Sequence, residues 1–136
     1  MSKIVSSVVA VVVVGLAGVA FAAGSAASPE QQASCVKVFE KQRACTDSFI
    51  PALVDVRVSL DKPKGIAASA KSEGRDALVT AALAEWKNDS TDASIAKTCA
   101  SMPGGAVTPQ MEKCLAESSC TAFSQCLVPL LRATLH

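Results

Sequence analysis

The segment Cys114–Cys126, CLAESSCTAFSQC, carries three cysteines with five residues between successive ones. Three further cysteines lie upstream, at Cys35, Cys45 and Cys99. Six cysteines in a chain of 136 residues are typical of exported domains that disulfides hold together. Each disulfide contributes about 2 to 4 kcal/mol to stability. We therefore expect all six cysteines to be oxidised and structural.

A metal site is the first alternative for six cysteines. Structural zinc sites bring their ligands in close pairs such as C-x2-C. No such pair occurs here, because successive cysteines are separated by 9, 53, 14, 5 and 5 residues. The sequence therefore predicts no metal and no other cofactor, and the missing C-x-x-C also argues against a thioredoxin-like redox pair.

The sequence does not select one disulfide connectivity. Cys35 and Cys45 share one stripe of a predicted helix, about 15 Å apart along its axis, so they cannot bond each other. Antiparallel packing of this helix on the C-terminal region would leave Cys45 to pair with Cys114 or Cys120. A separate hairpin closed between Cys99 and Cys114 favours the set Cys35–Cys126, Cys45–Cys120 and Cys99–Cys114.

The spacing of Cys35 and Cys45 resembles one half of the twin C-x9-C helical hairpins. The second C-x9-C of that architecture is missing, since spacings of five follow near the C-terminus. The resemblance is one of architecture and implies no residue roles.

The N-terminus has the pattern of a secretory signal peptide. Lys3 precedes an apolar run over residues 4–22, which ends in Ala20 and Ala22 on either side of Phe21. The alternative is a retained anchor, because about 18 apolar residues can span a bilayer. The segment that follows is GSAAS, without a basic cluster. This favours cleavage and a secreted or periplasmic protein.

Cleavage after Ala22 would divide the chain into three parts. Residues 1–22 are the predicted signal peptide, residues 23–28 a flexible leader, and residues 29–136 one disulfide-linked helical domain. Lys3 is the one charge lost, which leaves 12 basic and 12 acidic residues. A neutral chain has no basic excess to bind nucleic acid. We therefore expect no nucleic-acid partner and, after signal cleavage, no membrane association.

Capping signals and apolar periodicity predict an all-α domain of four to six short helices. Ser28-Pro29 and Thr108-Pro109 each place a capping side chain before a proline in the first turn. Pro129 is expected to kink or end the last helix and leave LRATLH as a tail. Breaks between helices are expected at Pro51, Gly65, Pro103-Gly104-Gly105 and Ser118-Ser119.

The segment over residues 53–60 has an ambiguous pattern. Apolar residues alternate with Asp55, Arg57 and Ser59, as they do in a strand. No second strand is evident elsewhere, and an isolated strand leaves its backbone groups unpaired. We therefore expect a helix that begins at Pro51. Its apolar positions are a candidate interaction strip, unless both sides are buried between helices: Leu53, Val56, Val58 and Leu60.

Signatures of catalysis are missing from the sequence. The one histidine is the terminal residue His136, so no base accompanies a nucleophile. No G-x-S-x-G motif and no phosphate-binding glycine loop occur. The acidic residues are scattered over predicted polar faces, and Trp86 is expected to pack in the core or at its rim rather than to bind a ligand.

We therefore expect an exported binding or interaction module without catalytic activity, whose partner is a protein or peptide in the exported compartment. The alternative is a small-ligand carrier or an enzyme with a site assembled from scattered carboxylates.

Signal cleavage is directly testable. N-terminal sequencing of the exported protein should begin at Ala23, because Ala20 and Ala22 form the small-residue cleavage pattern. Recovery of the chain from a membrane fraction with Met1 still attached would instead indicate an anchored domain.

Overall fold

The structure is a computed structural model that describes residues 27–102 and 108–136. The predicted signal peptide, residues 23–26 of the leader and the break at Pro103-Gly104-Gly105 lie outside this range. The described residues form seven α-helices and no strand, which confirms a small all-α domain linked by disulfides. The helices are α2 (Pro29–Ala44), α3 (Thr46–Leu60), α4 (Ile66–Glu73), α5 (Arg75–Asp89), α6 (Asp92–Ser101), α7 (Pro109–Cys114) and α8 (Cys120–Leu135).

Local capping signals fix several helix starts. The Ser28 hydroxyl accepts from the Gln31 N–H, and the Gln31 side chain accepts from the Ser28 N–H, as in a capping box. At the starts of α7 and α8 the cap is one-sided: the hydroxyls of Thr108 and Ser119 each accept from the backbone N–H three residues ahead. The break expected at Ser118-Ser119 is therefore confirmed. Ala27 and Ser28, assigned to the leader by the sequence, are tied to the start of α2.

The break expected at Pro51 is wrong, and the chain breaks instead at Cys45. The Thr46 hydroxyl donates to the Arg43 carbonyl at 2.6 Å. In a continuous helix this carbonyl would accept from the backbone N–H four residues ahead, so the hydroxyl takes the place of that donor. Pro51 lies inside α3 and removes one helix hydrogen bond without ending the helix. The joint at Cys45 replaces the one expected at Pro51, and the joint at Gly74 raises the count of helices among the described residues to seven, above the predicted four to six.

The tail predicted after Pro129 is also wrong, because α8 continues to Leu135. Leu131 is buried in the core, and the Arg132 guanidinium donates to the Ser59 hydroxyl on α3 at 3.2 Å. These contacts compensate for the hydrogen bond that Pro129 cannot make.

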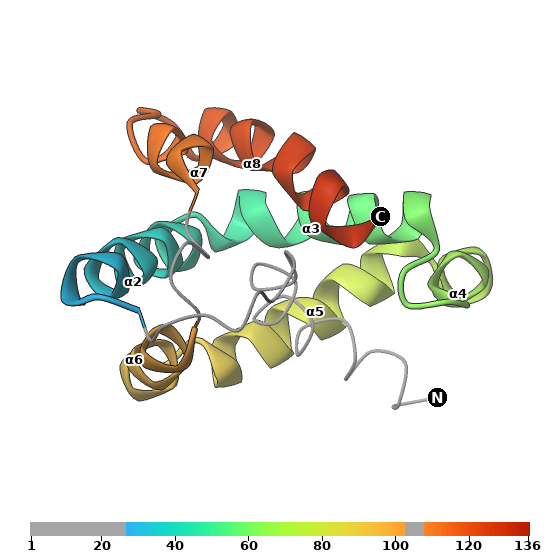
Figure 1. The fold of residues 1–136 in the computed structure, drawn as a ribbon. Helices are drawn as coiled ribbons and strands as arrows, with labels where there is room; N and C mark the ends of the chain where they lie inside the picture. The colour runs from blue at the N-terminus through green and yellow to red at the C-terminus, as the bar shows by residue number, and fades with distance from the viewer. Residues whose placement is uncertain (1–26, 103–107) are drawn as a thin grey trace.

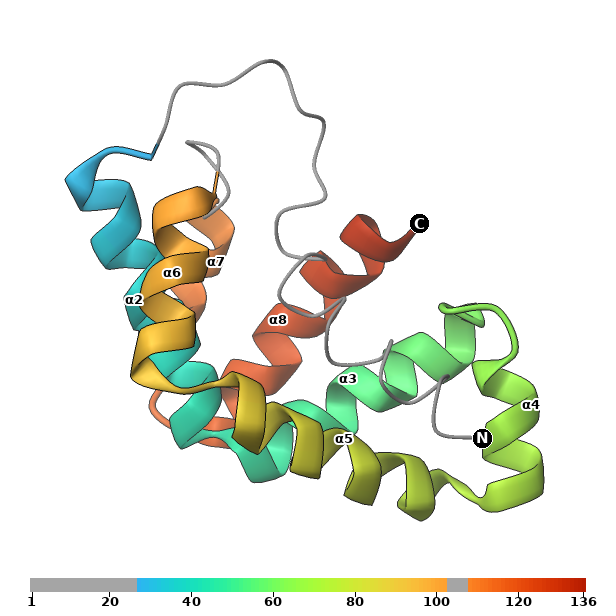
Figure 2. The same ribbon diagram turned by 90° about the horizontal axis from the view of Figure 1, so that it is seen from below.

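Helix α3 is the centre of the arrangement. It packs against α8, α5 and α4, while α6 packs against α2 and α7 against α8. Figure 1 shows α8 running along one side of α3 and α5 crossing below it. From below, α2 and α6 lie side by side at one end of the molecule and α4 lies at the other (Figure 2). An Arg75–Asp55 ion pair links the start of α5 to α3.

Three disulfides connect the helices and include all six cysteines. Cys35–Cys99 joins α2 to α6, Cys45–Cys120 joins the α2–α3 joint to α8, and Cys114–Cys126 joins α7 to α8. Their Cα–Cα distances are 5.7, 5.0 and 5.6 Å. The favoured pairing was right for Cys45–Cys120 and wrong for the other two. Helix α6 packs on α2, and this places Cys99 beside Cys35.

Two of the largest fully buried side chains in this core are polar. Gln42 is 0% exposed, and neither its amide oxygen nor its nitrogen finds a partner among the described residues. The Arg57 guanidinium is 1% exposed and donates from Nη1 to the Lys62 carbonyl, beyond the end of α3. Burial lowers the pKa of Arg57, because desolvation disfavours its charged form.

Over residues 27–102 and 108–136, no helix combines the length and the apolar character that crossing a membrane requires.

The length of α8 can be tested by mutation. Leu131→Ala should destabilise the protein by about 2 to 5 kcal/mol, because it removes a core side chain. Leu135→Ala, at a partly exposed position on the same helix, should cost clearly less. Urea unfolding measures both effects. If both substitutions have equally small effects, the residues after Pro129 form the tail that the sequence predicts and not a packed part of α8.

Candidate functional site

The predicted interaction strip does not form an exposed surface. Leu53 and Val56 are 1% and 2% exposed and belong to the core, so the strip is wrong for these two residues. Val58 and Leu60 are partly buried against the same core. The structure supports the other interpretation, in which helices cover both sides of this segment, because α3 packs against α8 as well as against α4 and α5.

An aromatic cluster lies beneath the joint between α2 and α3. The Trp86 ring stacks on Phe39 with centroids 6.4 Å apart, and Phe49 meets it at a tilt with centroids 5.9 Å apart. The indole Nε1–H donates to Thr46 Oγ1 at 3.1 Å. A buried indole needs such a partner. Trp86 is 1% exposed and packs in the core, as its place in the helical pattern predicts.

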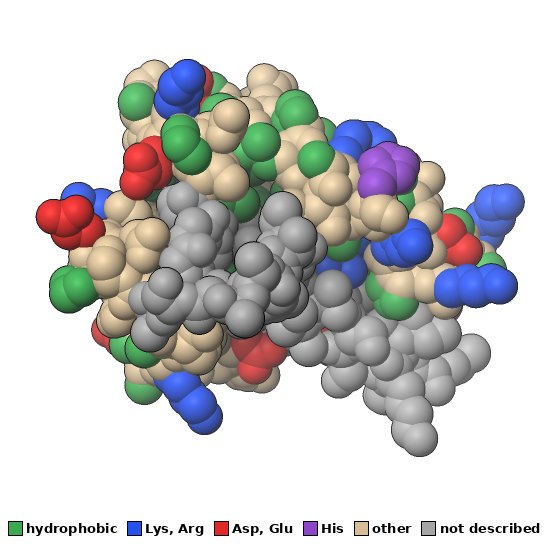
Figure 3. Space-filling model, in the orientation of Figure 1, with side chains coloured by type: hydrophobic (Ala, Val, Ile, Leu, Met, Phe, Trp, Pro, Cys, Tyr) green, Lys and Arg blue, Asp and Glu red, His purple; other side chains and the backbone are tan. Residues whose placement is uncertain are grey.

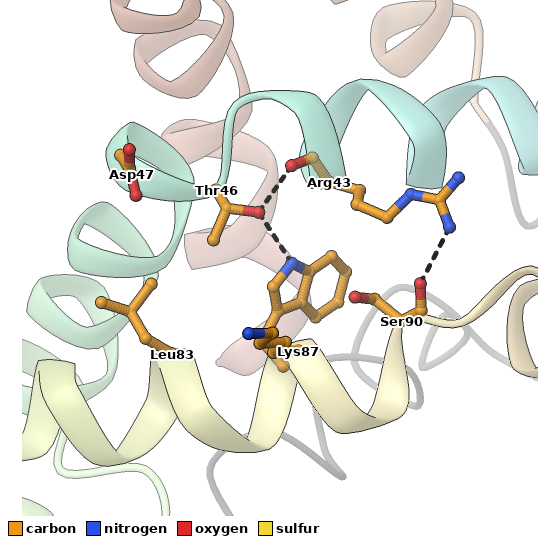
Figure 4. Close-up of a pocket in the computed structure, with 7 residues that line it drawn as sticks. Arg43, Thr46, Asp47, Leu83, Lys87 and Ser90 are labelled. Carbon is orange, nitrogen blue, oxygen red and sulfur yellow. Dashed lines mark hydrogen bonds between the residues drawn. The ribbon is translucent and has the colours of Figure 1, made fainter.

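A groove of about 510 Å³ opens directly above this cluster. We call it the Trp86 groove. Figure 4 shows its residues on the two facing sides, with the α2–α3 joint above and α5 below. The lining residues are Arg43, Thr46, Asp47, Leu83, Trp86, Lys87 and Ser90.

Charged side chains surround the apolar floor of the Trp86 groove. The Arg43 guanidinium donates to the Ser90 carbonyl at 3.1 Å and to Asp92 Oδ1 at 2.6 Å. Lys87 is exposed, and Asp47 lies on the other side of Thr46 from Arg43 (Figure 4). The groove thus joins an apolar surface to a basic end and an acidic end. Such a mixture suits recognition of a small polar-apolar group.

A second, shallower depression of about 350 Å³ lies between α3 and α8. Asp47 and Asp55 contribute carboxylates, but Asp55 accepts two hydrogen bonds from Arg75, at 2.6 and 2.9 Å. That pairing also raises the pKa of Arg75 above its usual value. Ser124, which lines this depression, is 4% exposed, and its hydroxyl has no partner in the described part of the chain. Only one carboxylate, on Asp47, is therefore left without an ion pair in this depression.

Side chains of metal-ligating type do not gather in the described residues: no group of three among His, Cys, Asp and Glu could hold an ion. On the face shown in Figure 3, basic side chains gather around the histidine at the right with an acidic group among them, whereas both signs of charge occur at the left.

The residues of the Trp86 groove could not be identified from the sequence. Arg43 and Lys87 lie on helix faces whose sequence pattern indicates only exposure to solvent. Thr46 and Trp86, which form a hydrogen bond, are 40 residues apart in the sequence. No local spacing encodes that contact. The one local signal, the polar run NDSTD at residues 88–92, predicts a break between helices but not a groove.

The chain matches no protein-family model, no curated protein and no solved structure.

The hydrogen bond beneath the groove makes a testable contribution to stability. Thr46→Val retains the side-chain volume but removes the acceptor for the Trp86 indole, and should cost about 1 to 3 kcal/mol. Thr46→Ser retains the hydroxyl and should cost less. Urea unfolding monitored by fluorescence of Trp86, the one tryptophan in the chain, compares them. If Val and Ser cost the same, the hydrogen bond contributes nothing measurable.

Proposed function

We propose that this protein is an exported binding module that uses the Trp86 groove to contact a protein or peptide partner. The observation that carries the proposal is the groove itself, which combines an apolar floor with Arg43, Lys87 and Asp47 at its edges. A partner can place an apolar side chain in such a site and satisfy its polar groups at the rim.

Covalent links beside the groove support this role. Cys45 immediately precedes Thr46 and is bonded to Cys120, which fixes the α2–α3 joint against α8. Cys35–Cys99 ties α2 to α6, and Asp92 at the start of α6 holds Arg43. Walls fixed in this way lose little conformational freedom when a partner binds, so less of the binding free energy is spent on ordering them.

Export is part of the proposal. Disulfides persist in oxidising compartments and are rare in the cytosol. All six cysteines of this chain are paired, and the N-terminal sequence has the features of a secretory signal. A secreted or periplasmic location is consistent with both observations.

The alternative of an enzyme or small-ligand carrier rests on the depression between α3 and α8. An enzyme that uses two carboxylates needs both available to the substrate. Asp55 is engaged by Arg75 in a two-point ion pair, so the observed arrangement favours binding over catalysis.

Capture of a partner from the native exported fraction tests the proposal. The purified protein with its three disulfides should retain a partner, and Lys87→Glu should reduce the retained amount at least tenfold, because it reverses a charge in the groove. Lys71→Glu makes the same change at an exposed position on α4, outside the groove, and should have no effect. Retention of no partner, or an equal loss with both variants, would argue against this function.

A further inference from the structure

The guanidinium of Arg43 has unused hydrogen-bond donors at the basic end of the Trp86 groove. Its two hydrogen bonds, to the Ser90 carbonyl and to Asp92, both come from Nη1. A guanidinium has five N–H donors. Nε and Nη2 make no hydrogen bond with the described residues, and the side chain is 38% exposed. One complete edge of the guanidinium therefore remains available.

The same edge already binds a carboxylate elsewhere in this protein. Arg75 donates from Nε to Asp55 Oδ1 at 2.6 Å and from Nη2 to Asp55 Oδ2 at 2.9 Å. Two parallel N–H donors match the two oxygens of a carboxylate, and this geometry adds specificity to the attraction between charges. The free edge of Arg43 has the same pair of donors.

The charges around Arg43 set the direction in which an anion can enter. Lys87 follows Trp86 in the chain, lines the groove, is exposed, and makes no ion pair within the described residues. Asp47 lies on the other side of Thr46 from Arg43 and would repel a carboxylate there. Asp92 occupies Nη1 only and is itself 89% exposed. The arrangement therefore favours an anion at the end of the groove where Arg43 lies.

We propose that the Trp86 groove recognises an acidic side chain of a peptide partner, with its carboxylate on the Nε–Nη2 edge of Arg43. This inference rests on the proposed binding function and names the chemistry that the partner presents. Lys87 adds attraction for the carboxylate, so the interaction weakens as salt screens it.

Trp86 gives a direct readout of occupancy. It is the one tryptophan of the chain, and its indole N–H is hydrogen-bonded to Thr46, a lining residue. A nitrogen-15-labelled sample therefore gives one indole signal, whose shift reports events in the groove. The probes are two capped tetrapeptides, acetyl-Ala-Leu-Glu-Ala-amide and acetyl-Ala-Leu-Gln-Ala-amide, which differ only in one carboxylate.

The glutamate peptide should shift the Trp86 indole signal in a saturable manner and bind at least tenfold more tightly than the glutamine peptide. Arg43→Lys retains the charge but lacks the fork, and should weaken binding of the glutamate peptide severalfold. Lys87→Gln should weaken it less, and Lys71→Gln should leave it unchanged. Because all these positions are at least partly exposed, the variants are expected to fold, and the backbone spectrum verifies this.

Equal affinities for the two peptides, no saturable shift, or an unaffected Arg43→Lys variant would overturn the assignment of an acidic ligand. A different result is that Lys87→Glu weakens the capture of a native partner and Arg43→Lys does not. That result would support the binding function and contradict the acidic ligand at the Nε–Nη2 edge of Arg43. Failure to capture any partner would instead contradict the binding function, so the two failures are distinguishable.

Discussion

The Cys45–Cys120 disulfide is the constraint on which the rest of the structure depends. Cys45 lies at the single residue between α2 and α3, and its partner is the first residue of α8, the helix that packs along α3. The bond links positions 75 residues apart, for which the chain-entropy account gives a stabilisation of about 4 kcal/mol. It also fixes the residue next to Thr46. Since Thr46 accepts the indole hydrogen bond, the disulfide, the aromatic cluster and the Trp86 groove form one connected unit.

This unit compensates for a shortage of aromatic residues. Three of the aromatic residues described by the structure, Phe39, Phe49 and Trp86, gather in one cluster, and most of the remaining core is aliphatic. In the last turn of α2, near the start of α8, Lys41 lies over the Phe123 ring at 5.8 Å and donates to the Glu117 carbonyl. A small core with little aromatic bulk provides limited stability, and cross-links raise it by restricting the unfolded chain. The same restriction keeps the groove walls in place without a large core behind them.

Features that depend on neighbours in sequence were predictable, and features that depend on tertiary packing were not. The caps at Ser28, Thr108 and Ser119 each involve a residue three positions ahead, so the sequence shows them directly. Pro51 and Pro129 were expected to interrupt helices on their local cost alone. Both remain inside helices, because the residues that follow them, such as Leu53 and Leu131, are buried by other elements. Pairing of Cys35 with Cys99 and formation of the groove depend on which helices meet, and no local pattern contains that information.

The alternating pattern over residues 53–60 shows how a helix can imitate a strand. Residues two apart on an α-helix differ in direction by about 200°, so they point to nearly opposite sides. A helix that is buried on one side therefore shows the usual three-to-four spacing, whereas a helix between two packed layers also needs apolar residues two apart. Helix α3 packs against α8 and against α4 and α5, and Val54 and Val56 are both buried. Polar residues of the same segment make contacts at the edges of α3: Asp55 accepts from Arg75 of α5, and Ser59 accepts from Arg132 of α8. Among the described residues, which form no strand, the alternation thus marks the central helix, and Leu53, Val54 and Val56 belong to its core.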